Sequence, residues 1–354
     1  MRYKKLSNKK LRRNTKRYSP RGAVRKQSLV NRAYRAGAEA YSRFHPTGSK
    51  AEGLELQLKR HLQQAWDVWN RSARLAQLSG LYSAACQSFI KGYCNKADFD
   101  IKSKLLLPTS RRVACIITVM NEEAMLQDQL DKLDRFLFHE VIVVVNGSSD
   151  RSYEIAMQHP IQAKVAHFEA ALGYDVGRAV GANLSTSDIV LFMDGDMSID
   201  VKMLLPFIYE AEKGADVVLN PISKILPLFK NRDAVSHMKE FLNVCLNRPD
   251  LLADSLTAVP HVLSRRALRQ LGTDVLSVPP LAHAKAVRNG LKVVSAPQTI
   301  DVIKLNKIRH LNNSKGNLVE QLIIGDHLEA LYQIMQESGS RLQFTDLLRR
   351  RYMI

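Results

Sequence analysis

Asp188-Ile-Val-Leu-Phe-Met-Asp-Gly-Asp196 is the stretch that decides the fold. Its apolar run predicts a buried strand, and two carboxylates follow at a spacing of two residues. Because side chains alternate along a strand, Asp194 and Asp196 leave the strand end on the same side and can converge on one ligand. A carboxylate pair at this place suits a divalent cation that carries phosphates. Taken alone, the stretch also fits a surface Asp-Gly-Asp turn.

Strands and helices alternate on both sides of this stretch. Strands are expected at 113–119, 140–145, 163–168, 189–193, 215–219 and 291–295, and helices at 122–136, 150–158, 176–184, 201–212, 233–246, 264–271 and 281–288. This alternation predicts an α/β fold with a mostly parallel sheet and helices on both faces.

The flanking regions have different compositions. Residues 1–52 are basic and expected to be disordered, because they can bury too little apolar surface to offset the entropy of ordering. Apolar residues at helical spacing, among them Leu58, Leu62 and Trp69, predict a helical hairpin with a linker over 53–110. The α/β domain is expected at 111–310. A C-terminal helical extension, with a helix around 318–335, is expected at 311–354.

The positive charge of the chain lies mainly in its N-terminal part. The net charge is +18, and residues 1–60 hold 18 Lys/Arg against 3 Asp/Glu, a net of +15. A basic tail of this kind can contact nucleic acid or an anionic surface through residues 1–50. It can equally serve only to keep the chain in solution.

The cysteine content and the hydropathy of the sequence indicate the cellular compartment of the protein. The four cysteines have neither metal-ligand spacing nor the density of a disulfide framework. No apolar run approaches the roughly 18 residues of a transmembrane helix. The N-terminus is basic but lacks the apolar region of an export signal. We therefore expect a cytoplasmic protein, with peripheral attachment to a membrane as the open alternative.

Polar residues follow the predicted strands where ligands bind in open parallel sheets, beyond the carboxyl ends. The first strand runs into Thr118-Val-Met-Asn-Glu-Glu123, and the second into Asn146-Gly-Ser-Ser-Asp150. Arg178 begins a helix beside the same edge, where an anion such as diphosphate can lie. Each segment alone is equally explained by helix capping or by solvation, so their common placement carries the prediction.

Over about residues 111–300 the chain resembles a family 2 glycosyltransferase with the GT-A fold that binds nucleotide sugars. Four ordered segments carry the resemblance: the strand that runs into Asn121-Glu-Glu123, Val143-Val-Val-Asn-Gly-Ser-Ser-Asp150, Gly177-Arg-Ala-Val-Gly181 and the "DxD" signature Asp194-Gly-Asp196. The fold that this implies is a GT-A-like, mostly parallel sheet with helices on both faces.

The resemblance also implies site residues. The nucleotide sugar would be bound by Thr118, Glu122, Glu123, Asn146, Arg178 and Asp194. Mg²⁺ or Mn²⁺ would be held by Asp194, Asp196 and His310. Asn146 stands where relatives have an Asp that accepts a hydrogen bond from uracil, and an Asn oxygen can accept the same bond. Met120 replaces a frequent aromatic, and Ala179 replaces an Asn.

The catalytic base of inverting relatives is missing. Its acidic position precedes a helix that ends in Gly, and here it reads Pro279-Pro280. Three explanations stay open. Another residue such as His283 or His261 acts as the base, the reaction retains configuration, or the chain does not catalyse. His283 is the residue we name, although a structural histidine fits the pattern as well.

The favoured function is transfer of a sugar from a nucleotide-diphosphate donor, UDP-linked by preference, to an acceptor that the sequence does not identify. The acceptor pocket is expected within residues 220–285, where 255–265 resembles the segment that frames the acceptor in relatives. The alternative is a non-catalytic nucleotide-binding protein that docks on RNA or an anionic surface through its basic tail. A nucleotidyltransferase is disfavoured because no Gly-rich, Lys-containing loop follows the first strand.

Overall fold

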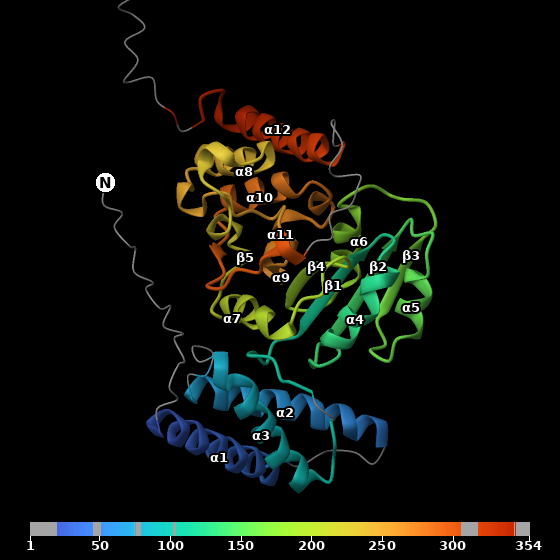
Figure 1. The fold of residues 1–354 in the computed structure, drawn as a ribbon, viewed down its shortest axis with the longest axis vertical. Coiled ribbons are helices and arrows are strands. Elements are labelled where there is room, and N and C mark those ends of the chain that lie inside the picture. Colours follow the sequence, from blue (N-terminus) through green and yellow to red (C-terminus); the bar gives the residue numbers. More distant parts are fainter. Residues whose placement is uncertain are drawn as a thin grey trace, which may run out of the picture.

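The strand of Asp194, β4 (Ile189–Asp194), lies in the middle of the main sheet. The computed structural model describes residues 20–44, 51–73, 75, 79–101, 104–305, 318–342 and 344. In this part of the chain seven strands form one sheet, in the order β3-β2-β1-β4-β6-β5-β7 (Figure 1). The other strands are β1 (Val113–Val119), β2 (Glu140–Asn146), β3 (Lys164–Phe168), β5 (Val217–Leu219), β6 (His261–Ser264) and β7 (Val293–Ser295).

Six of these seven described strands run in the same direction, and β6 is antiparallel to its neighbours β4 and β5. The predicted α/β fold with a mostly parallel sheet is therefore confirmed. The antiparallel strand β6 was not predicted: its four residues were assigned to a loop and the start of a helix. Short strands carry little periodicity, and β6 is defined by partners far away in the sequence.

Alternate residues of the central strands pack on opposite faces of the sheet. Val113, Cys115 and Ile117 of β1 belong to one apolar cluster, and Ala114 and Ile116 belong to another. The first face is covered by α4 (Glu123–Leu133), α5 (Ser152–Gln158) and α7 (Leu205–Glu212). The second is covered by α6 (Val176–Leu184), α9 (Arg265–Leu271) and α10 (Pro279–Arg288). Strands buried on both faces read as continuous apolar runs, which is why they were predictable.

An outer helical layer lies beyond the second face. Helix α8 (Ala234–Cys245) packs against α12 (Leu318–Ser338), and both also contact α10 (Figure 1). The short helix α11 (Val302–Leu305) follows β7. The structure therefore has a helix, α12, within the predicted C-terminal extension, and it packs on the main domain.

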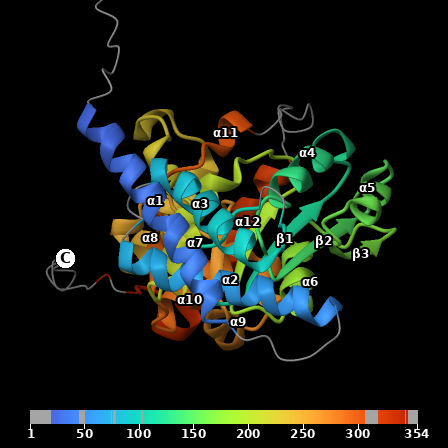
Figure 2. The ribbon, with the colours of Figure 1, turned by 90° about the horizontal axis from the view of Figure 1, so that it is seen from below.

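Three N-terminal helices form a bundle on the α7 side of the sheet (Figures 1 and 2). They are α1 (Pro20–Ser42), α2 (Ala51–Ala73) and α3 (Ser79–Ala97). Trp66 of α2 is fully buried, and its indole N–H donates to the Tyr82 hydroxyl of α3 at 2.9 Å. Helices α2 and α3 fall in the region for which the sequence predicts a hairpin.

Helix α1 corrects the prediction of disorder through residue 52. Two glycines explain why it is ordered: a Cβ on Gly37 would lie 2.0 Å from the Phe89 carbonyl oxygen, and one on Gly92 would lie 2.0 Å from that of Tyr34. Only glycine permits such a close crossing of α1 and α3. Two parts of the predicted tail, residues 1–19 and 45–50, lie outside the described residues.

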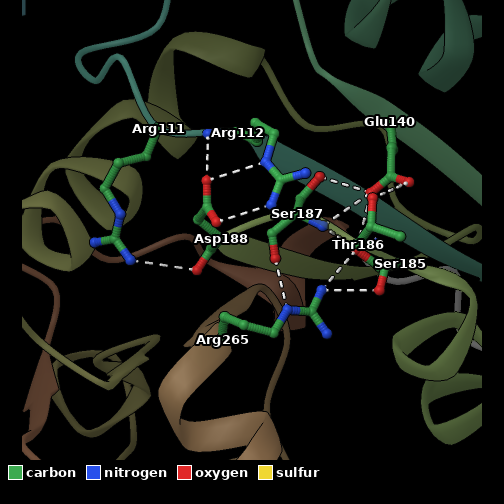
Figure 3. Close-up of polar contacts among 8 residues, drawn as sticks. All are labelled: Arg111, Arg112, Glu140, Ser185, Thr186, Ser187, Asp188 and Arg265. Atoms are coloured by element: carbon green, nitrogen blue, oxygen red, sulfur yellow. Dashed lines mark hydrogen bonds and ion pairs between the residues drawn. The ribbon is translucent and has the colours of Figure 1, made fainter.

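The amino ends of the strands are joined by a polar network, which Figure 3 shows. Glu140 at the start of β2 accepts hydrogen bonds from the backbone and hydroxyl groups of Ser187 at 3.1 and 2.6 Å. Arg112 pairs with Asp188 at 3.1 Å, and Arg265 donates to the Ser187 carbonyl oxygen at 2.8 Å. This edge is thus occupied by contacts that hold the loop before β4 in place.

All four cysteines are free thiols. Among the described helices, none has the length and apolar character needed to cross a bilayer.

Candidate nucleotide-sugar site

A pocket opens at the carboxyl ends of β1 and β4. Six predicted site residues line it together: Thr118, Glu122, Asn146, Arg178, Asp194 and Asp196. The register of the sheet explains part of this grouping, because Thr118 of β1 lies directly beside Asp194 of β4. Residues from separate chain segments therefore meet at the edge where open parallel sheets bind ligands.

The Asp194 carboxylate is held from two sides. The Thr118 hydroxyl donates to its Oδ1 at 2.8 Å, and Arg178 Nη2 lies 3.6 Å from its Oδ2. Gly195, the next residue, donates its N–H to the Thr118 carbonyl oxygen at 2.8 Å, and a Cβ there would lie 3.0 Å from Val119. The glycine between the two carboxylates thus permits the close approach of this turn to β1.

Arg178 is the buried cation of the pocket, with only 5% of its surface exposed. Burial alone lowers the pKa of its guanidinium, but the charges of Asp175 and Asp194 outweigh that effect, so the pKa is raised and the group stays charged. Asp175 lies 3.1 Å from Arg178 and also lines the pocket. Burial, more than any neighbouring charge, raises the pKa of Asp175.

Asp196 provides the observation that tests whether the site suits a cation. Its Oδ1 is buried and has no hydrogen-bond partner in the described structure. Burial, followed by the charge of Asp194, raises the pKa of Asp196 to about 6. A buried carboxylate oxygen without a donor, next to a second carboxylate, fits a hard divalent cation such as Mg²⁺ or Mn²⁺.

A third protein ligand for such a cation is not found in the described residues, where no three His, Cys, Asp or Glu side chains cluster at ligating distance. The predicted third ligand, His310, lies outside the described residues.

Asn146 lines the pocket and also bonds the loop that leads to α6. Its side-chain oxygen accepts from the Leu172 backbone N–H at 2.8 Å, and its amide donates to the Gly173 carbonyl oxygen at 2.8 Å. Both ends of the side chain thus hold the loop that leads to α6. In this structure the oxygen accepts one hydrogen bond from the protein, and an amide oxygen can accept a second.

Glu123 does not line the pocket. It takes part in a pairing of the loops after β1 and β2: its backbone N–H donates to Asp150 at 2.9 Å, and its carboxylate accepts from the Arg151 N–H at 3.1 Å. Asn121, with a φ of 58°, accepts from the Ser149 N–H at 2.8 Å in the same pairing. These bonds fix the rim of the pocket next to Glu122.

Neither histidine proposed as the base lines the pocket. His283 is fully buried in α10, where its Nε2 lies 2.7 Å from Asn243 Oδ1. Burial lowers the pKa of His283 to about 3, and that of His261 likewise. His261 is buried in β6 and bonds the Ala258 carbonyl oxygen at 3.0 Å. A residue out of contact with solvent in the core cannot accept a proton from an acceptor in the pocket, so His283 is not supported as the base. The prolines at 279 and 280 are buried in the first turn of α10.

Two pocket residues with polar side chains were missed from the sequence, Tyr174 and Asp175. Tyr174 is 55% exposed and so presents an aromatic surface at the pocket, where Val119 and Met120 are the other apolar side chains among the described lining residues. Both missed residues precede Arg178 in a loop without a regular pattern. Their short distance from Arg178 along the chain is the signal that was available.

Residues 114–260 match the family "Glycosyl transferase family 2". The uncharacterized glycosyltransferase YkcC of Bacillus subtilis is 23% identical over 111 residues, which are 29% of this chain and 34% of that protein. The match thus spans about a third of the curated relative's length.

Two solved structures of glucosyl-3-phosphoglycerate synthase from Mycobacterium tuberculosis are also similar. One contains Mn²⁺, UDP and glucosyl-3-phosphoglycerate; it is 19% identical, with 62% of this chain and 80% of that chain covered and a TM-score of 0.45. The other contains Mg²⁺ and UDP; it is 19% identical, with 62% and 79% covered and a TM-score of 0.45. Residues 114–260 of this chain are thus similar to the family 2 glycosyltransferases.

Proposed function

We propose that this chain transfers a sugar from a nucleotide-diphosphate donor, UDP-linked by preference, to a hydroxyl group of an acceptor with the help of a divalent cation. In this reaction the bond between the anomeric carbon and the diphosphate oxygen breaks, and a bond to the acceptor oxygen forms. One nucleoside diphosphate and the hydroxyl proton leave for each sugar transferred. The family match of residues 114–260 supports this class of reaction.

The observation that carries the proposal is the unpartnered, buried Oδ1 of Asp196 beside Asp194. We assign Asp196 as the direct ligand of Mg²⁺ or Mn²⁺ and Asp194 as a ligand of the same cation or of the ribose. When bound, the cation would neutralise charge on the departing diphosphate. His310 remains the proposed third ligand.

The other lining residues receive roles from their positions. Arg178, a charged guanidinium at the start of α6, is proposed to face the diphosphate. Thr118 orients Asp194 through its 2.8 Å hydrogen bond, and Glu122 is proposed to lie near the ribose. Asn146 is proposed to keep the loop before α6 in place, because its oxygen already accepts from Leu172.

The proposal is tested by titrating UDP in the presence of Mn²⁺ into the wild-type chain and into Asp196→Ala. The variant should bind UDP more weakly by roughly 100-fold. Losing a residue that only supports a metal ligand already costs up to about 100-fold in metal affinity, and Asp196 is the proposed ligand itself. It should keep its melting temperature, because the lost oxygen has no hydrogen-bond partner among the described residues.

Glu154→Ala is the matched control, since Glu154 is exposed on α5 and away from the pocket. It should bind UDP like the wild type. Equal UDP affinity of the wild type and Asp196→Ala, with and without Mn²⁺, would rule out the proposed cation site.

A further inference from the structure

A second pocket lies at the edge of the sheet where the amino ends of the strands meet. Its volume is about 460 Å³, and its lining residues come from the segments before β1 and β4 and from α9. Four of the six described lining residues are arginines and only one is acidic. We call it the arginine pocket, and it is lined by Arg111, Asp188, Arg265, Arg266, Arg269 and Gln270. Small-molecule sites commonly have volumes of about 300–1,000 Å³, so this pocket has room for a ligand.

Strand β4 separates the arginine pocket from the pocket of the proposed donor site. Asp188 precedes β4 and lines the arginine pocket, whereas Asp194 ends β4 and lines the donor pocket. A strand rises about 3.3 Å per residue, so the six residues of β4 span roughly 20 Å. The two sets of described lining residues have no member in common. A ligand of the arginine pocket is therefore a different molecule from the donor.

The carboxylates beside the arginine pocket are already paired. Arg112 holds Asp188 at two points, with Nη2 at 3.1 Å from Oδ1 and Nε at 3.3 Å from Oδ2 (Figure 3). The buried carboxylate of Asp216 pairs with Arg266 at 2.8 Å. Three arginines of the pocket are left without a carboxylate partner in the described part of the chain: Arg111, Arg265 and Arg269.

Two of these three arginines use their hydrogen-bond donors weakly or not at all. Arg111 donates to the carbonyl oxygens of Ala211 and Asp188, each at 3.4 Å, which is long for such a bond. Arg269 is exposed and makes no hydrogen bond or ion pair with any described residue. A guanidinium has five N–H donors, so most of the donors on these two side chains are available to a ligand.

Arg265 connects the pocket with the loop before β4. Its Nε donates to the Ser187 carbonyl oxygen at 2.8 Å, and its Nη2 donates to the Ser185 carbonyl oxygen at 2.9 Å (Figure 3). Both acceptors are neutral, so the charge of Arg265 is not cancelled by them. Burial lowers the pKa of Arg265, and the like charge of Arg269 acts in the same direction. The two guanidiniums thus repel each other in a pocket that lacks a free carboxylate among its described lining residues.

This arrangement suits a phosphate group. A phosphate monoester carries nearly two negative charges and three acceptor oxygens, and guanidiniums bind such groups through paired, charge-assisted hydrogen bonds. A single carboxylate would match only part of the excess charge. We propose that the arginine pocket binds the phosphate group of a second ligand, either a soluble phosphorylated compound or the headgroup of an anionic lipid. The geometry of the donor site has no part in this assignment.

The first experiment uses inorganic phosphate as the probe and follows the melting temperature of the full chain at constant ionic strength. Phosphate should raise the melting temperature of the wild type, because a ligand that binds only the folded state stabilises it. In Arg269→Gln the half-saturating phosphate concentration should rise by roughly tenfold or more, which corresponds to the loss of one hydrogen bond to a charged group. Phosphate also stabilises folded proteins in general, so the difference between the two chains is decisive.

The same variant distinguishes a binding role from a structural one. Without phosphate, Arg269→Gln should melt at the same or a higher temperature than the wild type, because Arg269 has no bond to a described residue and repels Arg265. Arg35→Gln, at an exposed arginine of α1 outside the pocket, should respond to phosphate like the wild type. A clear drop in the melting temperature of Arg269→Gln, or an unchanged phosphate response, would overturn the proposal.

A second measurement locates the bound group and identifies its source. Amide hydrogen exchange of residues 265–271 is followed with phosphate, with vesicles of phosphatidylcholine and phosphatidic acid, and with vesicles of phosphatidylcholine alone. Phosphate should slow the exchange in the wild type and not in Arg269→Gln. If the ligand is a lipid, the vesicles with phosphatidic acid should do the same, and those of phosphatidylcholine alone should not.

This local measurement is needed because the basic N-terminal residues can hold the chain on an anionic vesicle without any contact at the pocket. Slower exchange with phosphate but not with phosphatidic acid assigns a soluble ligand. Exchange that depends on Arg269 in none of these conditions overturns the site. Asp196→Ala should keep the full phosphate response, so a failure of the proposed donor site leaves the arginine pocket separately testable.

Discussion

At the scale of single residues, side chains with a strong local signal were the predictable ones. Asp194, Asp196 and Arg178 were predicted to converge because each follows or begins an element at one edge of the sheet, and all three line one pocket. The environments of Asn146 and His283 were not predictable. The bonds of Asn146 to Leu172 and Gly173, and that of His283 to Asn243, depend on tertiary contacts that no local pattern records.

Gly181 is important for packing because it has no side chain. It was quoted as part of the segment around Arg178, but the structure gives it a packing role: a Cβ would lie 2.4 Å from Ile116 Cγ2. This glycine lets α6 approach β1 closely and so brings Arg178 to Asp194. Gly177 acts in the same way against Thr118, at 2.9 Å.

We predict that Gly181→Ala lowers the free energy of unfolding by about 1–3 kcal/mol, the usual cost of overpacking a core. Urea denaturation measures this change. Gly325→Ala is the matched control, since Gly325 lies in the middle of α12, where an added Cβ would meet no atom within 4 Å. The control should gain about 0.5–1 kcal/mol from helix propensity. A neutral or stabilising Gly181→Ala would contradict the close-packing role.

At the scale of elements, long buried strands were predicted well, and elements defined by distant partners were missed. Strand β6 has four residues, and its pairing with β4 and β5 joins segments far apart in the chain. Helix α1 was taken as disordered because its composition is polar and basic. It gains its stability from α3, through the Gly37 and Gly92 crossing and the hydrogen bond from the Ser88 hydroxyl to the Val30 carbonyl oxygen at 2.8 Å.

For α1, we predict that Gly37→Val releases the helix from the bundle, because a valine side chain cannot fit where even a Cβ would lie 2.0 Å from a carbonyl oxygen. Proteases should then cut within residues 20–42, while UDP binding stays as in the wild type. Gly53→Val, at a helical glycine with open space around it, should leave α1 protected. Equal protease resistance in the two variants would show that the crossing does not hold α1.

At the scale of the whole molecule, the two edges of the sheet have different tasks. The carboxyl edge holds the pocket, with a buried carboxylate oxygen that lacks a partner among the described residues. The amino edge is a dense network, in which Glu140 accepts from Ser185, Thr186 and Ser187 (Figure 3). Glu140 also accepts from Lys164. The sequence predicted the strand that starts at Glu140 but not this network, because Ser185–Ser187 have no pattern beyond that of a loop.

The Glu140 network should make the stability of the whole domain depend on pH. Burial alone would raise the pKa of Glu140, but the hydrogen bonds from Lys164, Ser187, Thr186 and Ser185 lower it to about 2, from a usual value of 4.5. A carboxylate with a lowered pKa in the folded state stabilises that state above its unfolded pKa, and the contribution disappears as the pH falls from about 4.5 to about 2. The contribution amounts to at most about 3.5 kcal/mol, since one pKa unit corresponds to about 1.4 kcal/mol.

Glu140→Gln removes this titration and also leaves donors such as Ser187 competing for a single acceptor oxygen. We therefore expect the variant to be less stable at pH 7 by about 2–3 kcal/mol, and the difference from the wild type to shrink as the pH falls from about 4.5 towards about 2. Urea unfolding at a series of pH values measures both effects. Glu154→Gln, at an exposed carboxylate, should run parallel to the wild type. If the Glu140→Gln profile were also parallel, the charge of Glu140 would not be what holds the amino edge together.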